Sequence, residues 1–227
     1  MNAGINSYFQ WSQVDLFNLR VSTVETITLT FFTVIVVAIL GFALGLILFQ
    51  TKNSQKWYLK LLRGIVAFLV NVFRSIPFVV LIVLLIPFTK NIMGTIIGPK
   101  AAIPALVIAA APFYARLVEL AFNEVDLGVL EAAKSLGAKN SQTIWHVLLP
   151  ESLPALISGL TVTAISIIGY TAMAGVIGAG GLGNLAYQDG FEAGQNTVTL
   201  VATVVILIIV FICQYLGDWF TKRVDHR

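Results

Sequence analysis

The chain has 227 residues, of which 58% are hydrophobic and only 11% are charged, and its mean hydropathy is +0.90. A soluble domain carries about 25% charged residues, so this composition excludes a water-exposed globular fold and indicates a membrane protein. The formal net charge of +3 gives no indication of nucleic-acid binding, and no nucleic-acid partner is expected.

Five long apolar runs are predicted to cross the membrane as helices, because they do not show the alternating pattern of barrel strands. They cover residues 27–49, 64–89, 95–115, 152–175 and 196–217. The first run is uncharged and 23 residues long, which exceeds the roughly 20 residues that a bilayer core requires. We therefore expect an all-α integral membrane protein in contact with membrane lipid, with a single transmembrane domain over residues 1–227.

The lysines and arginines predict how these runs are oriented. The first cation is Arg20, so the start of the chain is not expected to be a cleaved signal peptide. Five spans place the termini on opposite sides. An outside N-terminus and a cytoplasmic C-terminus put three cations outside and ten inside, as the positive-inside rule requires. The inside set is Lys52, Lys56, Lys60, Arg63, Arg116, Lys134, Lys139, Lys222, Arg223 and Arg227, and the outside set is Arg20, Lys90 and Lys100.

The sequence contains no energy source that we can identify. An ion-coupled carrier usually keeps an acid near the middle of the membrane, and the five runs contain no Asp or Glu. No phosphate-binding loop of the form G-x-x-x-x-G-K-[ST] occurs either. The chain is therefore not expected to be an enzyme or to bind a cofactor. Two histidines, His146 and His226, and one cysteine, Cys213, are too few to predict a metal site or a disulfide.

Arg74, in the sequence NVFRSIP, lies within the second apolar run. It is either a cation of a pathway or interface, or an arginine near a span end that bonds backbone carbonyls freed by Pro77.

The prolines at 77, 87, 104 and 112 interrupt the second and third runs. Each frees a carbonyl that lipid cannot satisfy, so their faces are expected to turn towards protein or a wet pathway.

Three local features predict packing rather than chemistry. Arg116 and Glu119 are three residues apart and are expected to pair at the inner membrane boundary. Gly41 and Gly45 form a G-x-x-x-G pattern typical of helix packing. Residues 178–183 match G-x-G-x-x-G. They follow a membrane helix instead of a strand, so we predict a close-packed external loop, not a nucleotide site.

Residues 126–154, DLGVLEAAKSLGAKNSQTIWHVLLPESLP, form a polar island between two apolar runs. Asp126 is a favourable N-cap for a first short helix, and Gly137 is expected to end it. Asn140 or Ser141 can cap a second helix that ends before Pro150. A small amphipathic helix on the basic side of the membrane suits docking into another protein. The island therefore predicts a membrane subunit that is driven by a partner.

The island resembles the EAA signature of permease subunits of bacterial ABC importers. That signature is E-A-A, three residues, G, nine residues, an aliphatic residue, one residue and L-P. The matching residues are Glu131, Ala132, Ala133, Gly137, Leu149 and Pro150, and Val147 stands where the family usually has Ile. By this resemblance the segment is the coupling helix, which sits in a cleft of the ATPase subunit, and the fold is that of a type I ABC importer permease.

Three further segments resemble the methionine-type permease: residues 71–90, 109–119 and 169–190. The resemblance implies a homodimer in the bacterial inner membrane, two cytoplasmic ABC ATPases that bind ATP and magnesium, and an external methionine-binding lipoprotein. The external loop at residues 178–183 would then touch this binding protein. It also implies that Tyr170 and Met173 in the fourth run, together with Arg74, line the translocation pathway. Facing copies of Met173 would form an adaptable apolar gate, although a methionine in a span can also be simple packing.

Three alternative functions are compatible with some of these features. A permease for another small solute, such as a polar amino acid or a phosphonate, would share the fold and the EAA segment. A non-transporting scaffold would explain the hydrophobicity but not the EAA spacing. An ion-coupled secondary carrier would require acids that the apolar runs do not contain. The sequence therefore favours a methionine importer subunit over all three.

Overall fold

The computed structural model describes residues 4–225, except the side chain of Lys134, and every regular element in that range is a helix. The long helices are α1 (Leu16–Thr51), α2 (Trp57–Ser75), α5 (Pro99–Asn123), α8 (Leu149–Val176) and α10 (Asn196–Val224). The shorter α-helices are α3 (Phe78–Leu84), α4 (Ile86–Met93), α6 (Leu127–Ser135), α7 (Asn140–Thr143) and α9 (Gly181–Asn184). Two 3₁₀ turns, η1 (Ile5–Phe9) and η2 (Trp11–Gln13), and two π-helical segments, η3 (Ile144–Leu148) and η4 (Leu185–Glu192), complete the described chain.

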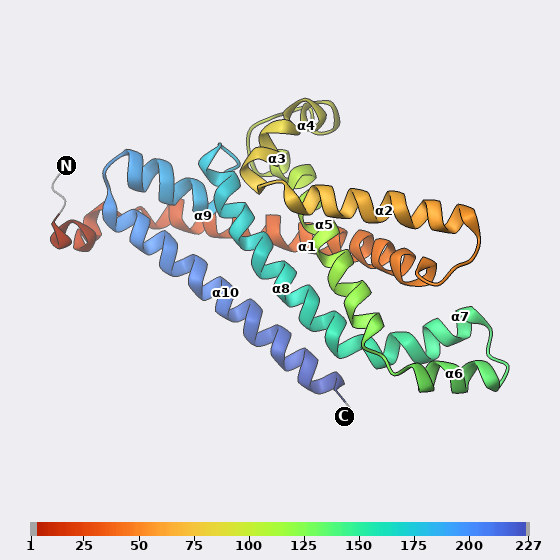
Figure 1. The fold of residues 1–227 in the computed structure, drawn as a ribbon. Coiled ribbons are helices and arrows are strands. Elements are labelled where there is room, and N and C mark those ends of the chain that lie inside the picture. Colours follow the sequence, from red (N-terminus) through yellow and green to blue (C-terminus); the bar gives the residue numbers. More distant parts are fainter. Residues whose placement is uncertain (1–3, 226–227) are drawn as a thin grey trace.

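The long helices run between two ends of the molecule (Figure 1). The described start of the chain, η4 and the start of α10 lie at one end. The connection from α1 to α2, the pair α6 and α7, and the end of α10 lie towards the other. The described termini are therefore at opposite ends of the molecule (Figure 1). The side of the membrane that each end faces stays a prediction from the lysine and arginine distribution.

The second apolar run does not form the straight span that its composition predicts. Four helices in the described range are long and apolar enough to cross a membrane, and α2 with α3 forms a pair bent by 109°. The described residues therefore provide four spans, or five if the bent pair is one broken span. The cause is local, because a proline disfavours the helical conformation in the residue before it. Ile76 is accordingly extended, with ψ of 125°, and α3 restarts after Pro77.

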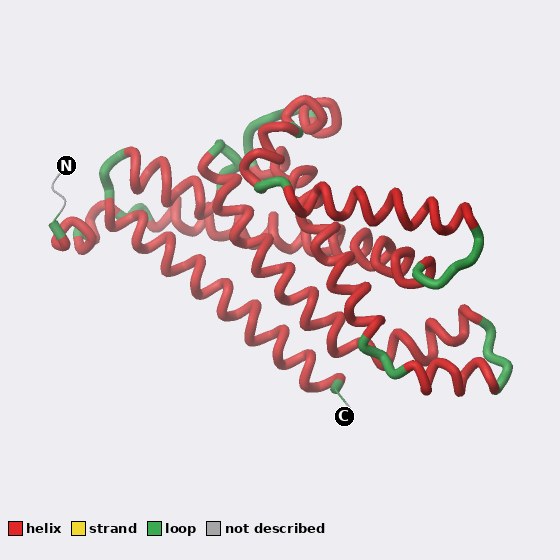
Figure 2. The backbone as a smooth tube through the Cα atoms, viewed as in Figure 1, coloured by secondary structure: helices red, strands yellow, loops and turns green. Residues whose placement is uncertain are grey.

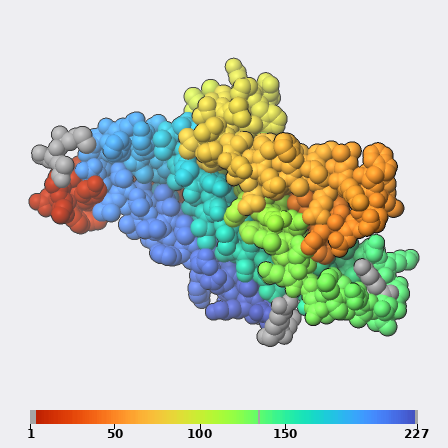
Figure 3. Space-filling model, viewed as in Figure 1, coloured from red at the N-terminus to blue at the C-terminus, as the bar shows by residue number. Residues whose placement is uncertain are grey.

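The third run begins four residues later than its composition predicts. Gly94 ends α4 in the left-handed conformation, with φ of 72°, and Gly98 precedes Pro99 with φ of 89°. The loops on either side of α3 and α4 are visible in Figure 2, and these two helices form the protrusion at the top of Figure 3. Pro104 and Pro112 do not end α5 and are buried, as predicted. Pro77 and Pro87, in contrast, are exposed on the single chain.

Helix α5 forms the centre of the bundle, with 72% of its most apolar window buried inside the chain. Gly41 and Gly45 of α1 allow that helix to approach it closely. A Cβ atom on Gly45 would lie 2.6 Å from the carbonyl oxygen of Ala115, and one on Gly41 would lie 2.8 Å from the Tyr114 ring. The predicted G-x-x-x-G packing face is therefore confirmed, and its partner is α5.

We expect Gly45→Ala to destabilise the protein, because the new methyl group would overlap the backbone of α5. Overpacking of this kind costs about 1–3 kcal/mol, so the Tm in detergent should fall by several degrees. Gly64→Ala in α2 is the matched control, since a Cβ atom there would meet nothing within 4 Å and alanine favours helices. Equal Tm values for the two variants would contradict close α1–α5 packing.

The ends of the helices extend beyond the apolar runs. Helix α1 has 36 residues, which corresponds to about 54 Å at 1.5 Å per residue and exceeds the hydrocarbon core. Its first turns contain Glu25, whose carboxylate accepts a hydrogen bond from the Gly181 amide at 2.8 Å. Thr26 accepts one from the Leu182 amide at 2.9 Å. The glycine-rich run is thus packed against α1, which confirms a close-packed loop, while its predicted contact with a binding protein stays a prediction.

Candidate functional site: an exposed coupling segment and a cationic pocket

The polar island folds into α6, α7 and η3, which project at one end of the molecule (Figure 1). These three elements are called the coupling segment below. Asp126 caps the start of α6, because its Oδ1 accepts a hydrogen bond from the Gly128 amide at 2.7 Å. At the other end Gly137 has φ of 82°, and the Ala138 amide bonds to the Ala133 carbonyl at 3.1 Å. This is the six-to-one bond of a helix that ends in a left-handed glycine. The predicted start and stop of the first helix are confirmed.

The predicted end of the second helix is wrong. Helix α7 starts at Asn140, preceded by Lys139, whose amide donates to Gln142 Oε1 at 2.8 Å. The helix then continues through Pro150 without a break, so residues 140–176 form one continuous helix, which changes direction between α7 and α8 (Figure 1). The wide π-helical turn η3 comes directly before the proline, whose ring would otherwise contact a carbonyl in the preceding turn. The polar island is therefore joined directly to α8, with no loop between them.

The matched EAA residues lie on or beside the open face of this segment. Glu131, Ala132, Gly137 and Pro150 are exposed, and Ala133 and Leu149 are half-buried. Leu136 is 89% exposed, whereas Leu130 and Ile144 pack against the core cluster that contains Phe122 and Leu148. One side of the segment therefore holds it on the bundle and the other presents apolar side chains to solvent.

Sequence reasoning missed the exposed apolar residues of this face. Leu127 and Trp145 are 72% and 61% exposed, although apolar residues at helical spacing suggest burial. The exposure of Leu127 and Trp145 could have been predicted from their position inside a polar segment. An exposed apolar patch bordered by polar residues is typical of a protein interaction site.

A cluster of polar side chains joins α1, α2 and α5 near the end of α5, next to the coupling segment. The predicted Arg116–Glu119 pair is confirmed, and Glu119 also pairs with Arg63 of α2 at 3.6 Å. The Glu119 side chain is only 5% exposed. Asn123 bonds to the Glu119 carbonyl and accepts a hydrogen bond from Lys52 at the end of α1. One buried carboxylate thus joins α2 to α5 where α5 leads into the island.

We expect Glu119→Gln to lower the stability of the bundle, because it leaves two arginines without their carboxylate partner. Removing one partner of a buried pair costs about 3–5 kcal/mol. Because Arg63 and Arg116 are partly exposed, we expect about 2 kcal/mol, since water compensates some of the lost interaction. Glu124→Gln makes the same change at an exposed position one turn further on and should leave the Tm in detergent unchanged. Equal losses would show that the cluster does not stabilise the bundle.

The structure brings two of the three predicted pathway residues together. Arg74 and Tyr170 line one pocket of about 260 Å³ between α2, α3, α5 and α8. The Arg74 guanidinium lies 6.0 Å from the centre of the Phe113 ring, and Tyr170 stacks on Phe78 with ring centres 4.8 Å apart. Met173 does not line this pocket. It lies one turn further along α8 and is 48% exposed on the single chain.

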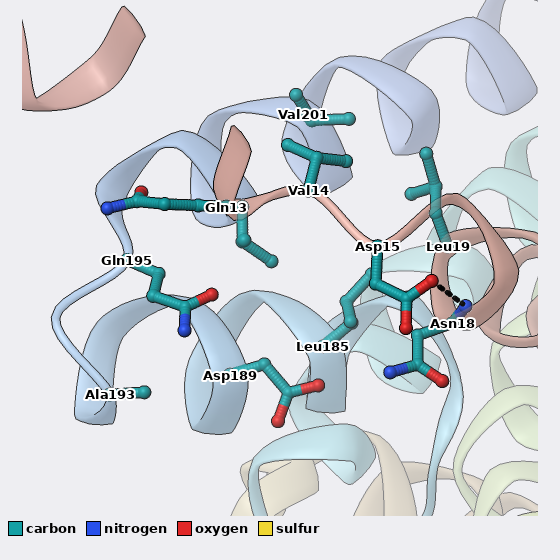
Figure 4. A pocket seen from close by; sticks show the side chains of 11 residues that line it. Gln13, Val14, Asp15, Asn18, Leu19, Leu185, Asp189, Ala193, Gln195 and Val201 are labelled. Atoms are coloured by element: carbon teal, nitrogen blue, oxygen red, sulfur yellow. Dashed lines mark hydrogen bonds between the residues drawn. The ribbon is translucent and has the colours of Figure 1, made fainter. Parts of the chain in front are cut away.

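A second pocket, of about 300 Å³, lies at the opposite end of the molecule from the coupling segment. Figure 4 shows polar side chains from the chain start, η4 and the start of α10 turned towards it, among them Asp15, Asp189 and Gln195. Asp15 also caps α1 through the Phe17 amide at 2.8 Å. The polar start of the chain packs at this end through a 2.9 Å hydrogen bond from the Gln10 amide to the Thr197 hydroxyl.

A membrane bundle with an exposed helical segment between two of its spans is the arrangement expected of a permease subunit that a separate protein drives. Comparison with known proteins gives the same class, because the family model "Binding-protein-dependent transport system inner membrane component" matches residues 41–227. The chain therefore belongs to this family of multi-pass inner-membrane components and, within it, to the permeases of methionine ABC transporters.

The relatives carry methionine transport in their names. The chain is 61% identical to the "Methionine import system permease protein MetP" of Bacillus subtilis, over 80% of this chain and 82% of the relative. It is 42% identical to the "Probable D-methionine transport system permease protein MetI" of Vibrio cholerae, over 98% and 99%. A solved structure, "Inward facing conformations of the MetNI methionine ABC transporter", matches with a TM-score of 0.89 and 40% identity, over 93% of this chain and 98% of that one.

Proposed function

We propose that this chain forms the translocation pathway of an ATP-driven methionine importer and acts as a homodimer. Two cytoplasmic ABC ATPases would bind ATP and magnesium, and an external methionine-binding lipoprotein would deliver the substrate. The exposed coupling segment carries this proposal, because its open apolar face and its EAA residues fit a docking cleft in a separate subunit. The names of the relatives support methionine as the substrate.

The connections of the segment support a mechanical role. It continues into α8 without a break, and Tyr170 and Met173 lie on that same helix. A displacement of the segment would therefore be transmitted along α8 to the pathway residues. In this mechanism ATP binding closes the ATPase pair, brings the two coupling segments together and opens the permease outwards, and hydrolysis resets it.

The proposed orientation has the N-terminus outside and the coupling segment in the cytoplasm. The ends of the molecule support it, because Lys52, Lys139 and Arg223 all lie in the segments that form the same end (Figure 1). Cytoplasmic loops carry an excess of lysine and arginine. The buried carboxylate of Glu119 and the half-buried one of Glu25 also lie towards the ends of the helices, where they bond to protein groups. An ion-coupling acid in mid-membrane is thus not apparent in the described residues.

Uptake by intact cells tests the function against its alternatives. The chain is expressed with its ATPase and binding protein in cells that lack their own methionine importer. Labelled methionine, glutamine and a phosphonate are then compared. We expect methionine uptake that stops on ATP depletion and survives a proton ionophore. Preferential uptake of glutamine or the phosphonate would favour a permease for another solute, and uptake that stops only with the ionophore would favour a secondary carrier.

A further inference from the structure

Arg74 is a cation far from the charged boundary of the bundle. It lies eleven residues after Arg63 on α2, which is about 16 Å along a helix axis. Arg63 marks the boundary because it joins the Glu119 cluster. A charged side chain at this depth is costly in lipid and normally faces protein or a wet cavity. The exposed side of Arg74 is therefore not a lipid-facing surface.

Among the described residues, no carboxylate pairs with Arg74. Its contact there is with the Phe113 ring, whereas Arg63 and Arg116 share the Glu119 carboxylate. Its position in the last turn of α2 allows the helix dipole to stabilise the cation without using its donors. The five N–H donors of the guanidinium can therefore bind an anion, and a carboxylate fits their planar fork.

Apart from Arg74 and the Tyr170 hydroxyl, the side chains that line the pocket are apolar. Phe73, Phe78, Phe113 and Tyr170 supply aromatic surface, and no acidic residue lines the pocket in the described chain. The stacked pair of Phe78 and Tyr170 makes one wall flat and fixed. Aromatic surfaces favour a thioether, because sulfur makes attractive contacts with rings. The volume of about 260 Å³ lies just below the range of about 300–1,000 Å³ for drug-sized ligands, which suits a single amino acid.

We propose that this pocket is a substrate-binding site of the permease itself, in which Arg74 binds the α-carboxylate and the aromatic walls bind an unbranched apolar side chain. The inference rests on the proposed function and adds a binding site and a recognition rule to it. The pocket offers a cation and no acid, so it recognises the carboxylate of the substrate and not its ammonium group. The permease then selects substrate a second time, after the external binding protein.

Direct binding to the purified permease–ATPase complex, without binding protein, tests the site. Labelled L-methionine is titrated onto the complex in lipid nanodiscs. Two competitors separate the substrate groups: 4-(methylthio)butanoate keeps the carboxylate and lacks the ammonium, and methioninol keeps the ammonium and lacks the carboxylate. We expect the first to displace methionine and the second to fail. Displacement by methioninol alone, or by both equally well, would overturn the proposed recognition, and no binding of methionine would overturn the site.

Substitution of the arginine gives an independent reading. Arg74→Gln should weaken methionine binding on the order of 10- to 100-fold, the loss expected for a charged hydrogen-bonded pair, and Arg74→Lys should weaken it less. Arg223→Gln is the matched control, because Arg223 also lies over an aromatic ring, that of Trp219, but at the end of α10. Equal affinity in wild type and Arg74→Gln would overturn the proposal. If the variants do not assemble with the ATPase, the competitor titration with the wild-type complex still tests whether the site binds the carboxylate.

Different results would reject the importer function and the binding site. Wild-type protein that imports methionine with ATP but shows no binding in nanodiscs would leave the importer function intact and reject the site. Absence of ATP-dependent methionine uptake by the wild type would reject the function itself.

Discussion

Gly137→Asp is expected to abolish co-purification of the ATPase with the detergent-solubilised permease, whereas Gly94→Asp leaves it unchanged. The two glycines are matched in conformation, because φ is 82° at Gly137 and 72° at Gly94. A Cβ atom at either would meet nothing within 4 Å. Aspartate is among the residues that tolerate this conformation, so each variant should fold at a similar small cost. The positions differ in location, since Gly137 ends the coupling helix and Gly94 ends α4.

The expected loss comes from the docking face itself. Gly137 is exposed beside Leu136, and an added carboxylate there would have to lose water when the apolar face is covered. An unpaired charge in an interface is strongly unfavourable, so the amount of ATPase recovered should fall below detection. Equal recovery with Gly137→Asp and wild type would place the docking site elsewhere. Recovery of no ATPase with wild type would contradict an ABC importer subunit.

Met173→Ala is expected to uncouple ATP hydrolysis from transport. Met173 is 48% exposed on the single chain and lies one turn beyond the pocket that Tyr170 lines. In a homodimer, facing copies could close the pathway with a flexible thioether on each side. Removal of both side chains should leave a gap, so that ATP is still hydrolysed while imported methionine leaks back. The ATP consumed per methionine accumulated should then rise several-fold.

Met93→Ala provides the control for this prediction. Met93 ends α4, away from α8, and its truncation removes the same volume from another part of the protein. Both variants are measured in vesicles for ATP hydrolysis and for methionine retained. A ratio for Met173→Ala equal to those of wild type and Met93→Ala would reject a gate role and leave Met173 as a packing residue.

The features that sequence reasoning predicted correctly are local ones. The uncharged runs of α1 and α10, the cap at Asp126 and the stop at Gly137 each depend on residues within one or two helical turns. The Arg116–Glu119 pair is also local, since three residues separate its partners. Propensity and spacing carry this information directly, and the EAA positions could therefore be located before the fold was known.

The features that it missed depend on contacts between distant segments. Composition alone does not reveal that α2 and α3 meet at 109°, because Pro77 ends a helix without fixing where the next one points. Continuation of the helix through Pro150 depends on the π-helical turn before it. The Arg63–Glu119 pair and the bond from Gly181 to Glu25 join residues far apart in sequence. The joint pocket of Arg74 and Tyr170 arises in the same way, from helices that only the fold brings together.

ATP-dependent accumulation of methionine in reconstituted vesicles tests the central proposal most directly. The vesicles contain the complex of this chain with its ATPase, oriented with the ATPase inside, and the binding protein with labelled methionine is added outside. We predict that methionine accumulates against its gradient when ATP and magnesium are enclosed, and that a non-hydrolysable ATP analogue supports no accumulation. Equal accumulation with ATP and with the analogue, or accumulation of glutamine in place of methionine, would contradict the proposal.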